Sequence, residues 1–210
     1  SRVLELAQDG MAWTRTGLAH AAGVSATVVD GLHDQGVFER THVPAPPVVA
    51  LPEPDYGGMP LSSDQQAAAD TIRATVSEGD FSVTLIDGIT GSGKTEVYFE
   101  AIAETLRRGK QVLILLPEIA LTHAFLDRFQ DRFGAKPAEW HSDLAPKMRE
   151  KVWRQAAEGR VRVVAGARSA LFLPFRDLGL IVVDEEHEQA FKQEEGVIYH
   201  ARDMAVVRAH

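Results

Sequence analysis

The residues best suited to chemistry form the stretch GITGSGKT, from Gly88 to Thr95. It matches the phosphate-loop pattern G-x-x-x-x-G-K-[ST] and stands between an apolar run and a helix-like run, as such loops do. Glycines let the backbone curl so that successive N–H groups point at phosphate oxygens, and the following helix adds its positive end. The alternative is a glycine-rich turn with no chemical role. The nucleotide-binding residues predicted here are Gly88, Ile89, Thr90, Gly91, Ser92, Gly93, Lys94 and Thr95.

A second group of candidate residues stands in the stretch LIVVDEEHE, residues 180–188. An apolar strand would present Asp184 at its carboxyl end, where open α/β sheets bind their ligands. Asp184 and Thr95 would hold Mg²⁺, Glu185 would polarise an attacking water, and Lys94 would bind the β- and γ-phosphates. Alone, the acidic run could be a solvated turn, but the upstream loop favours a nucleotide-hydrolysing site. We therefore predict Glu185 and Lys94 as catalytic, and Thr95 and Asp184 as Mg²⁺ ligands.

Alternating strands and helices would position these residues. The apolar strand runs indicate a mostly parallel sheet covered by helices on both faces, and hence an α/β fold. We expect strands at 81–86, 111–116, 139–141, 161–165 and 180–184, and helices at 62–76, 94–108, 122–133 and 146–158.

The first 60 residues differ from the rest. Residues 1–43 suggest a small winged-helix domain, with three short helices and a strand-like run at 37–43. DNA binding is one interpretation, but residues 1–60 carry three Arg against seven Asp and Glu, which favours a packing or spacer role. Residues 44–60 hold six of the ten prolines and read as a semi-rigid linker. The α/β domain would then occupy 61–210.

Composition excludes several classes of protein. The chain has 210 residues, a net charge of −8 and no cysteine, so disulfides and thiolate metal sites are excluded. The acidic balance means that any contact with nucleic acid must be local. No apolar run reaches the length of a membrane span and no signal peptide opens the chain, so we expect a cytoplasmic protein. The first residue is not Met, and the chain reads as part of a longer one.

Several stretches together resemble a known family. The tetrad DEEH at 184–187 resembles the DEAD and DEAH boxes of superfamily 2 helicases, 113–122 resembles their motif Ia, and 166–175 resembles motif Ib. With 86–98 and 199–209, the chain resembles the superfamily 2 helicases that restart bacterial replication. The resemblance implies a RecA-like P-loop NTPase lobe behind a winged helix, and an ATP-driven 3′→5′ DNA helicase.

The resemblance also implies roles for individual residues. Gln65 would read the adenine of ATP, although helix capping explains this glutamine equally well, and His187 would couple the nucleotide site to DNA. In an aromatic-rich loop at 191–203, Val197 and Ile198 stand where a Trp and a basic residue are common. The residues expected to contact or support DNA are Pro117, Glu118, Thr122, Arg168, Ser169, Phe191, Lys192, Tyr199 and His200.

Further parts of such a helicase would lie outside these residues. They include a second lobe with an arginine finger and a zinc module, so the cofactors expected here are ATP and Mg²⁺ alone. The expected partners are single-stranded and forked DNA, with primosome and single-strand-binding proteins recruited by the full-length protein. Residues 1–210 alone should bind ATP weakly and hydrolyse little. The alternatives are another fork-remodelling superfamily 2 motor, or a winged-helix DNA-binding protein that senses ATP without hydrolysing it.

Overall fold

A computed structural model describes residues 2–8, 10–41, 46–117, 120, 122–194 and 196–210. The chain divides into two compact units, residues 1–46 and residues 47–210. Each has its own hydrophobic core, and each is described by itself. None of the helices within the described ranges is long and apolar enough to cross a membrane.

The first unit is a group of three short helices, as predicted. They are α1 (Arg2–Ala7), α2 (Arg15–Ala22) and α3 (Ala26–Asp34), packed around Val3, Leu18 and Val29. Thr14 begins α2, because its hydroxyl accepts a hydrogen bond from the Gly17 N–H at 3.0 Å. The predicted strand at 37–43 is wrong for residues 37–41, which form none, and 42–43 lie outside the described residues. The part of this unit that is described offers no second strand with which it could pair.

The second unit is built on a sheet of four parallel strands. The strands are β1 (Gln111–Leu115), β2 (Ala138–Trp140), β3 (Val163–Gly166) and β4 (Leu178–Val183), in the order β2-β3-β1-β4. Strand β1 lies inside the sheet and every residue of it is buried. This confirms the predicted α/β class with a parallel sheet.

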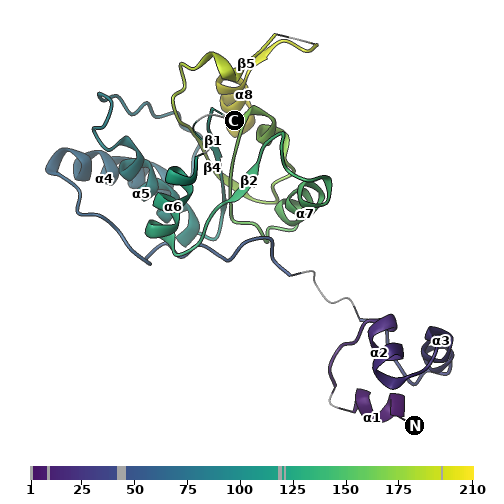
Figure 1. The fold of residues 1–210 in the computed structure, drawn as a ribbon. Coiled ribbons are helices and arrows are strands. Elements are labelled where there is room, and N and C mark those ends of the chain that lie inside the picture. Colours follow the sequence, from purple (N-terminus) through teal and green to yellow (C-terminus); the bar gives the residue numbers. More distant parts are fainter. Residues whose placement is uncertain (1, 9, 42–45, 118–119, 121, 195) are drawn as a thin grey trace. The chain divides into compact units, whose positions relative to one another are not determined.

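Helices cover both faces of the sheet (Figure 1). Successive strand residues point to opposite faces, so Val112 and Ile114 pack on one side while Leu113 and Leu115 pack on the other. The first side is covered by α5 (Lys94–Arg107) and α6 (His123–Phe133), with α4 (Ser63–Glu78) packed on α5. The second side is covered by α7 (Pro146–Ala157), the 3₁₀ helix η2 (Arg168–Phe172) and α8 (Ala201–Ala209). A second 3₁₀ helix, η3 (Gln189–Phe191), and a hairpin of β5 (Lys192–Gln193) and β6 (Tyr199–His200) precede α8.

The strand predicted at 81–86 is wrong. These residues have no regular structure, and Val83 and Leu85 are 66% and 77% exposed. A strand needs a neighbour for its backbone hydrogen bonds. Strand β4 lies at the edge of the sheet and, within the described chain, pairs with β1 alone. The outer edge of β4 is therefore unpaired in the described chain, and residues 81–86 do not form a ladder with it.

Residues 47–60 of the proline-rich segment lie against the second unit. The Val48 N–H donates to the Gln155 side chain at 2.9 Å, and the Glu53 N–H donates to the Phe133 carbonyl at 2.9 Å. The Arg132 guanidinium donates to the Pro54 carbonyl at 2.7 Å. These contacts hold this part of the segment on the lobe.

Candidate nucleotide site

The phosphate loop and the acidic turn line the same cavity, although about ninety residues separate them in the sequence. The cavity has a volume of about 140 Å³. It lies where the start of α5 meets the carboxyl end of β4. Its lining residues are Thr90, Gly91, Gly93, Lys94, Thr95, Arg128, Asp184 and Glu185.

The loop takes its shape from two glycines with positive φ. Gly91 has φ 80° and Gly93, which precedes α5, has φ 83°, a region that favours glycine. A β-carbon at Gly93 would also clash with the side-chain amide of Gln65. The backbone thus turns tightly before α5, and its first N–H groups have no partner inside the helix, as an anion site requires.

Lys94 folds back onto its own loop. Its Nζ donates to the carbonyl of Gly88 at 2.7 Å and to that of Ile89 at 3.3 Å. The ammonium group is therefore held beside the cavity by neutral acceptors. A phosphate would be a stronger partner, since hydrogen bonds between two charged groups are shorter and stronger.

Gln65 braces the loop from α4. Its side-chain oxygen accepts from the Ser62 N–H at 2.9 Å, and the Ser62 hydroxyl accepts from the Gln65 N–H, which together make a capping box. Its side-chain nitrogen donates to the Ser92 carbonyl at 2.8 Å. The capping interpretation of Gln65 is confirmed, and the residue also contacts the phosphate loop. Its role in reading adenine stays a prediction.

Asp184 directly follows β4 and is fixed by three hydrogen bonds. Its N–H donates to the Leu115 carbonyl at 3.0 Å, which extends the pairing of β4 with β1. One carboxylate oxygen accepts from the Glu185 N–H at 3.0 Å, and the other accepts from the Tyr98 hydroxyl at 3.0 Å. Burial raises the pKa of the Tyr98 hydroxyl well above its usual range, and the Asp184 charge raises it further, so this hydroxyl stays protonated and donates.

Glu185 stands in a strained conformation. Its φ of 50° is in the left-handed region, and no other non-glycine residue of the described chain shares this feature. Such strain is concentrated at functional sites. The Glu185 side chain is half-exposed and lies 3.6 Å from the His187 Nε2, so the predicted coupling histidine contacts the predicted catalytic carboxylate.

The residues present fit a Mg²⁺ ion that is shared with a nucleotide. The described part of the chain has no cluster of three or more His, Cys, Asp or Glu suited to a metal. Mg²⁺ in nucleotide sites keeps several waters and takes only one or two protein oxygens besides the phosphates. Thr95 and Asp184, which line the cavity together, are such a pair.

Two residues at this site escaped the sequence analysis. Tyr98 lies one turn after Thr95, so its spacing from the loop was a usable signal. Arg128 on α6 also lines the cavity and forms an ion pair with Glu96. No local pattern marks Arg128, because only the packing of α6 beside α5 brings it there.

The residues expected from motif Ia have structural roles where they are described. Pro117 is buried, and its carbonyl accepts from the Ala120 N–H at 2.8 Å. Thr122 begins α6, with its hydroxyl accepting from the Phe125 N–H at 3.4 Å. Glu118 lies outside the described residues.

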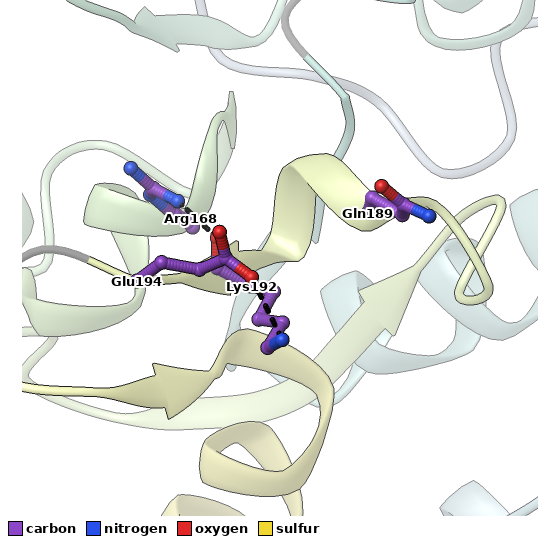
Figure 2. A pocket seen from close by; sticks show the side chains of 4 residues that line it. All are labelled: Arg168, Gln189, Lys192 and Glu194. Atoms are coloured by element: carbon purple, nitrogen blue, oxygen red, sulfur yellow. Dashed lines mark hydrogen bonds and ion pairs between the residues drawn. The ribbon is translucent and has the colours of Figure 1, made fainter.

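A larger cavity, of about 510 Å³, lies beside η2 and is lined by Arg168, Gln189, Lys192 and Glu194 (Figure 2). Arg168 donates to the Lys192 carbonyl at 2.6 Å, and the Lys192 ammonium lies 2.7 Å from the Glu194 carboxylate. Ser169, next to Arg168, accepts from the Trp140 ring N–H at 3.2 Å. The structure thus brings Arg168 and Lys192, from separate predicted motifs, to one cavity.

The expectation that the aromatic residues of the loop at 191–203 contact DNA needs a correction. Phe191 is 1% exposed and packs in the core against the sheet, so its ring is not available to a base. His200 begins α8, its Nδ1 accepting from the Arg202 N–H at 3.2 Å. Tyr199 packs edge-to-face on Phe172, with ring centres 5.5 Å apart. Phe172, within the stretch that resembles motif Ib, was not predicted as a site residue and is 58% exposed.

Comparison with known proteins agrees with this geometry. The DEAD/DEAH box helicase family matches residues 62–209. Replication restart protein PriA of Bacillus subtilis is 46% identical over 151 residues, which are 72% of this chain and 19% of that protein. PriA of Rickettsia typhi is 49% identical over 154 residues, 73% of this chain and 23% of that protein.

The similarity covers a limited part of these relatives, because the chain spans about a fifth of their length. Among solved structures, helicase MrfA bound to DNA and AMPPNP aligns with 78% of this chain and 26% of its own, at 21% identity and a TM-score of 0.44. The match at 62–209 includes α4, the phosphate loop, the acidic turn and all of α8. The chain belongs to the DEAD/DEAH box helicase family.

Proposed function

We propose that residues 61–210 are the ATP-binding lobe of a replication-restart helicase, which hydrolyses ATP to move 3′→5′ along single-stranded DNA at forks. The observation that carries this proposal is the single cavity lined by Lys94, Thr95, Asp184 and Glu185. The high identity to PriA of several bacteria supports the replication-restart role. Primosome and single-strand-binding proteins would meet the full-length, cytoplasmic protein.

The geometry suggests how the residues act. The loop N–H groups bind the β-phosphate, and Lys94 exchanges the carbonyls of Gly88 and Ile89 for β- and γ-phosphate oxygens. Mg²⁺, when bound, neutralises charge on these phosphates. Glu185 orients a water for attack on the γ-phosphorus and takes up its proton as the bond to the β-phosphate oxygen breaks.

DNA would be bound on the surface that carries Arg168, Lys192 and Phe172. Arg and Lys suit phosphate contacts without sequence preference, and an exposed ring suits base stacking. In the absence of DNA, Arg168 is occupied by the Lys192 carbonyl. The contact between His187 and Glu185 offers a route by which DNA could influence hydrolysis.

The test is Glu185→Gln in the full-length protein, with DNA-stimulated phosphate release and ATP binding measured side by side. Turnover should fall by about 10²–10⁴-fold, the contribution typical of a general base, while ATP binding persists. The control is Glu188→Gln, a carboxylate on the same turn outside the cavity, which should leave turnover unchanged. Unchanged turnover in Glu185→Gln would remove its catalytic role. A wild-type protein that binds ATP without turnover would favour the ATP-sensing alternative.

Polarity needs its own assay on the same protein. Duplexes that carry a 3′ or a 5′ single-stranded overhang would be compared for unwinding. A 3′→5′ motor unwinds the duplex with the 3′ overhang, and a preference for the 5′ overhang would contradict the proposal.

A further inference from the structure

The hydroxyl of Tyr98 contacts one of the two residues that would hold the metal ion. Tyr98 is 5% exposed and its ring packs edge-to-face on Phe99, with centres 5.3 Å apart. Its oxygen lies 3.0 Å from an Asp184 carboxylate oxygen. Thr95, the other predicted ligand, lies one turn before Tyr98 on α5. A packed ring thus holds its hydroxyl against the Asp184 carboxylate.

The direction of this hydrogen bond follows from counting protons. Tyr98 has one hydroxyl proton, and a carboxylate can only accept, so that proton goes to Asp184. The bond therefore fixes one Asp184 oxygen without neutralising its charge.

The remaining partner of Asp184 is also neutral. Its other oxygen accepts from the Glu185 N–H at 3.0 Å. Within the described part of the chain, no Lys, Arg or His forms an ion pair with Asp184. Two neutral donors therefore orient the carboxylate. Because neither donor is charged, the negative charge of Asp184 can attract a metal ion.

We propose that Tyr98 is a positioning residue for the divalent cation: its hydroxyl holds the Asp184 carboxylate in place as a preformed oxygen ligand. Resting on the proposed ATP site, this goes beyond it by assigning a residue outside the phosphate-loop pattern at 88–95 and the acidic turn. The link also joins α5, which begins at the phosphate loop, to the end of β4. Such outer partners of metal ligands typically account for 10–100-fold in metal affinity.

The test compares wild type and Tyr98→Phe in the full-length protein. The probe is mant-AMPPNP, a fluorescent ATP analogue that is not hydrolysed, titrated at increasing free Mg²⁺ and separately in EDTA. In Tyr98→Phe, which keeps the packed ring, the Mg²⁺ concentration for half-maximal binding should rise by about 10-fold or more. Binding in EDTA should equal that of wild type, because the loop and Lys94 are intact. The control Tyr56→Phe removes a hydroxyl from an exposed tyrosine and should shift neither value.

A double-mutant cycle with Asp184→Asn tests whether Tyr98 acts by positioning Asp184 or only by stabilising the fold. If Tyr98 acts through Asp184, Tyr98→Phe should add little to the Mg²⁺ shift once Asp184 is changed. An unchanged Mg²⁺ midpoint in Tyr98→Phe, an equal loss of binding with and without Mg²⁺, or additive effects in the cycle would each overturn the proposal. A wild-type protein that binds no mant-AMPPNP in any condition would overturn the proposed function itself, and the Tyr98 role with it.

Discussion

The phosphate loop and the acidic turn line one cavity, but different kinds of contact hold them in place. Asp184 continues a parallel ladder in which every residue of the buried strand β1 from Val112 to Leu115 has a partner in β4. The loop follows residues 81–87, which form no strand and are largely exposed. Side-chain hydrogen bonds from Gln65 and Lys94 to its carbonyls stabilise it. A region with few buried contacts opens locally at a low cost in free energy. We therefore expect the acidic turn to be preformed and the phosphate loop to adapt its conformation to the nucleotide.

The largest expected effect contrasts two leucines, Leu113 in β1 and Leu85 in the run before the loop. Leu113→Ala should lower the free energy of unfolding by about 2–5 kcal/mol, because it empties a fully buried site. Leu85→Ala should change it by less than about 0.5 kcal/mol, as exposed substitutions do. Urea unfolding followed by circular dichroism measures both. Equal losses of unfolding free energy in the two variants would show that residues 81–86 are packed as firmly as the sheet. That result would contradict the difference between the two halves of the site.

The next effect concerns Lys94. Lys94→Ala should weaken ATP binding by about 10–100-fold, since a hydrogen bond to a charged group contributes about 1.5–3 kcal/mol. The free energy of unfolding should barely change, because Lys94 contacts only loop carbonyls. Lys147→Ala, at an exposed lysine of α7, is the matched control. Equilibrium titration with ATP measures the affinity of each variant. An unchanged ATP affinity in Lys94→Ala would show that the loop lysine does not bind the nucleotide.

The smallest effect tests the brace from α4. Gln65→Ala removes a neutral hydrogen bond to the Ser92 carbonyl and should weaken ATP binding by about 2–10-fold, equivalent to 0.5–1.5 kcal/mol. The control is Gln66→Ala, whose side chain contacts only Asp70 on the surface of α4. If both variants bind ATP alike, Gln65 is a helix cap and the loop does not depend on it.

Local patterns predicted the parts of the site that depend on neighbouring residues in the chain. The glycines, Lys94 and Thr95 needed only the loop pattern, and Asp184 needed only an apolar run before it. The strand at 81–86 failed because a strand depends on a partner that its own residues cannot reveal. For the same reason the sequence did not reveal Arg128, which tertiary packing alone brings to the cavity, or the burial of Phe191.

The most direct test of the account is a crystal structure of the full-length protein with AMPPNP and Mg²⁺. The account predicts that the Lys94 ammonium leaves the carbonyls of Gly88 and Ile89 for phosphate oxygens, while the Asp184 backbone stays in place. Thr95 and Asp184 should contact the metal, directly or through water. A nucleotide bound elsewhere, or Lys94 still on the loop carbonyls with the phosphates out of its reach, would contradict it.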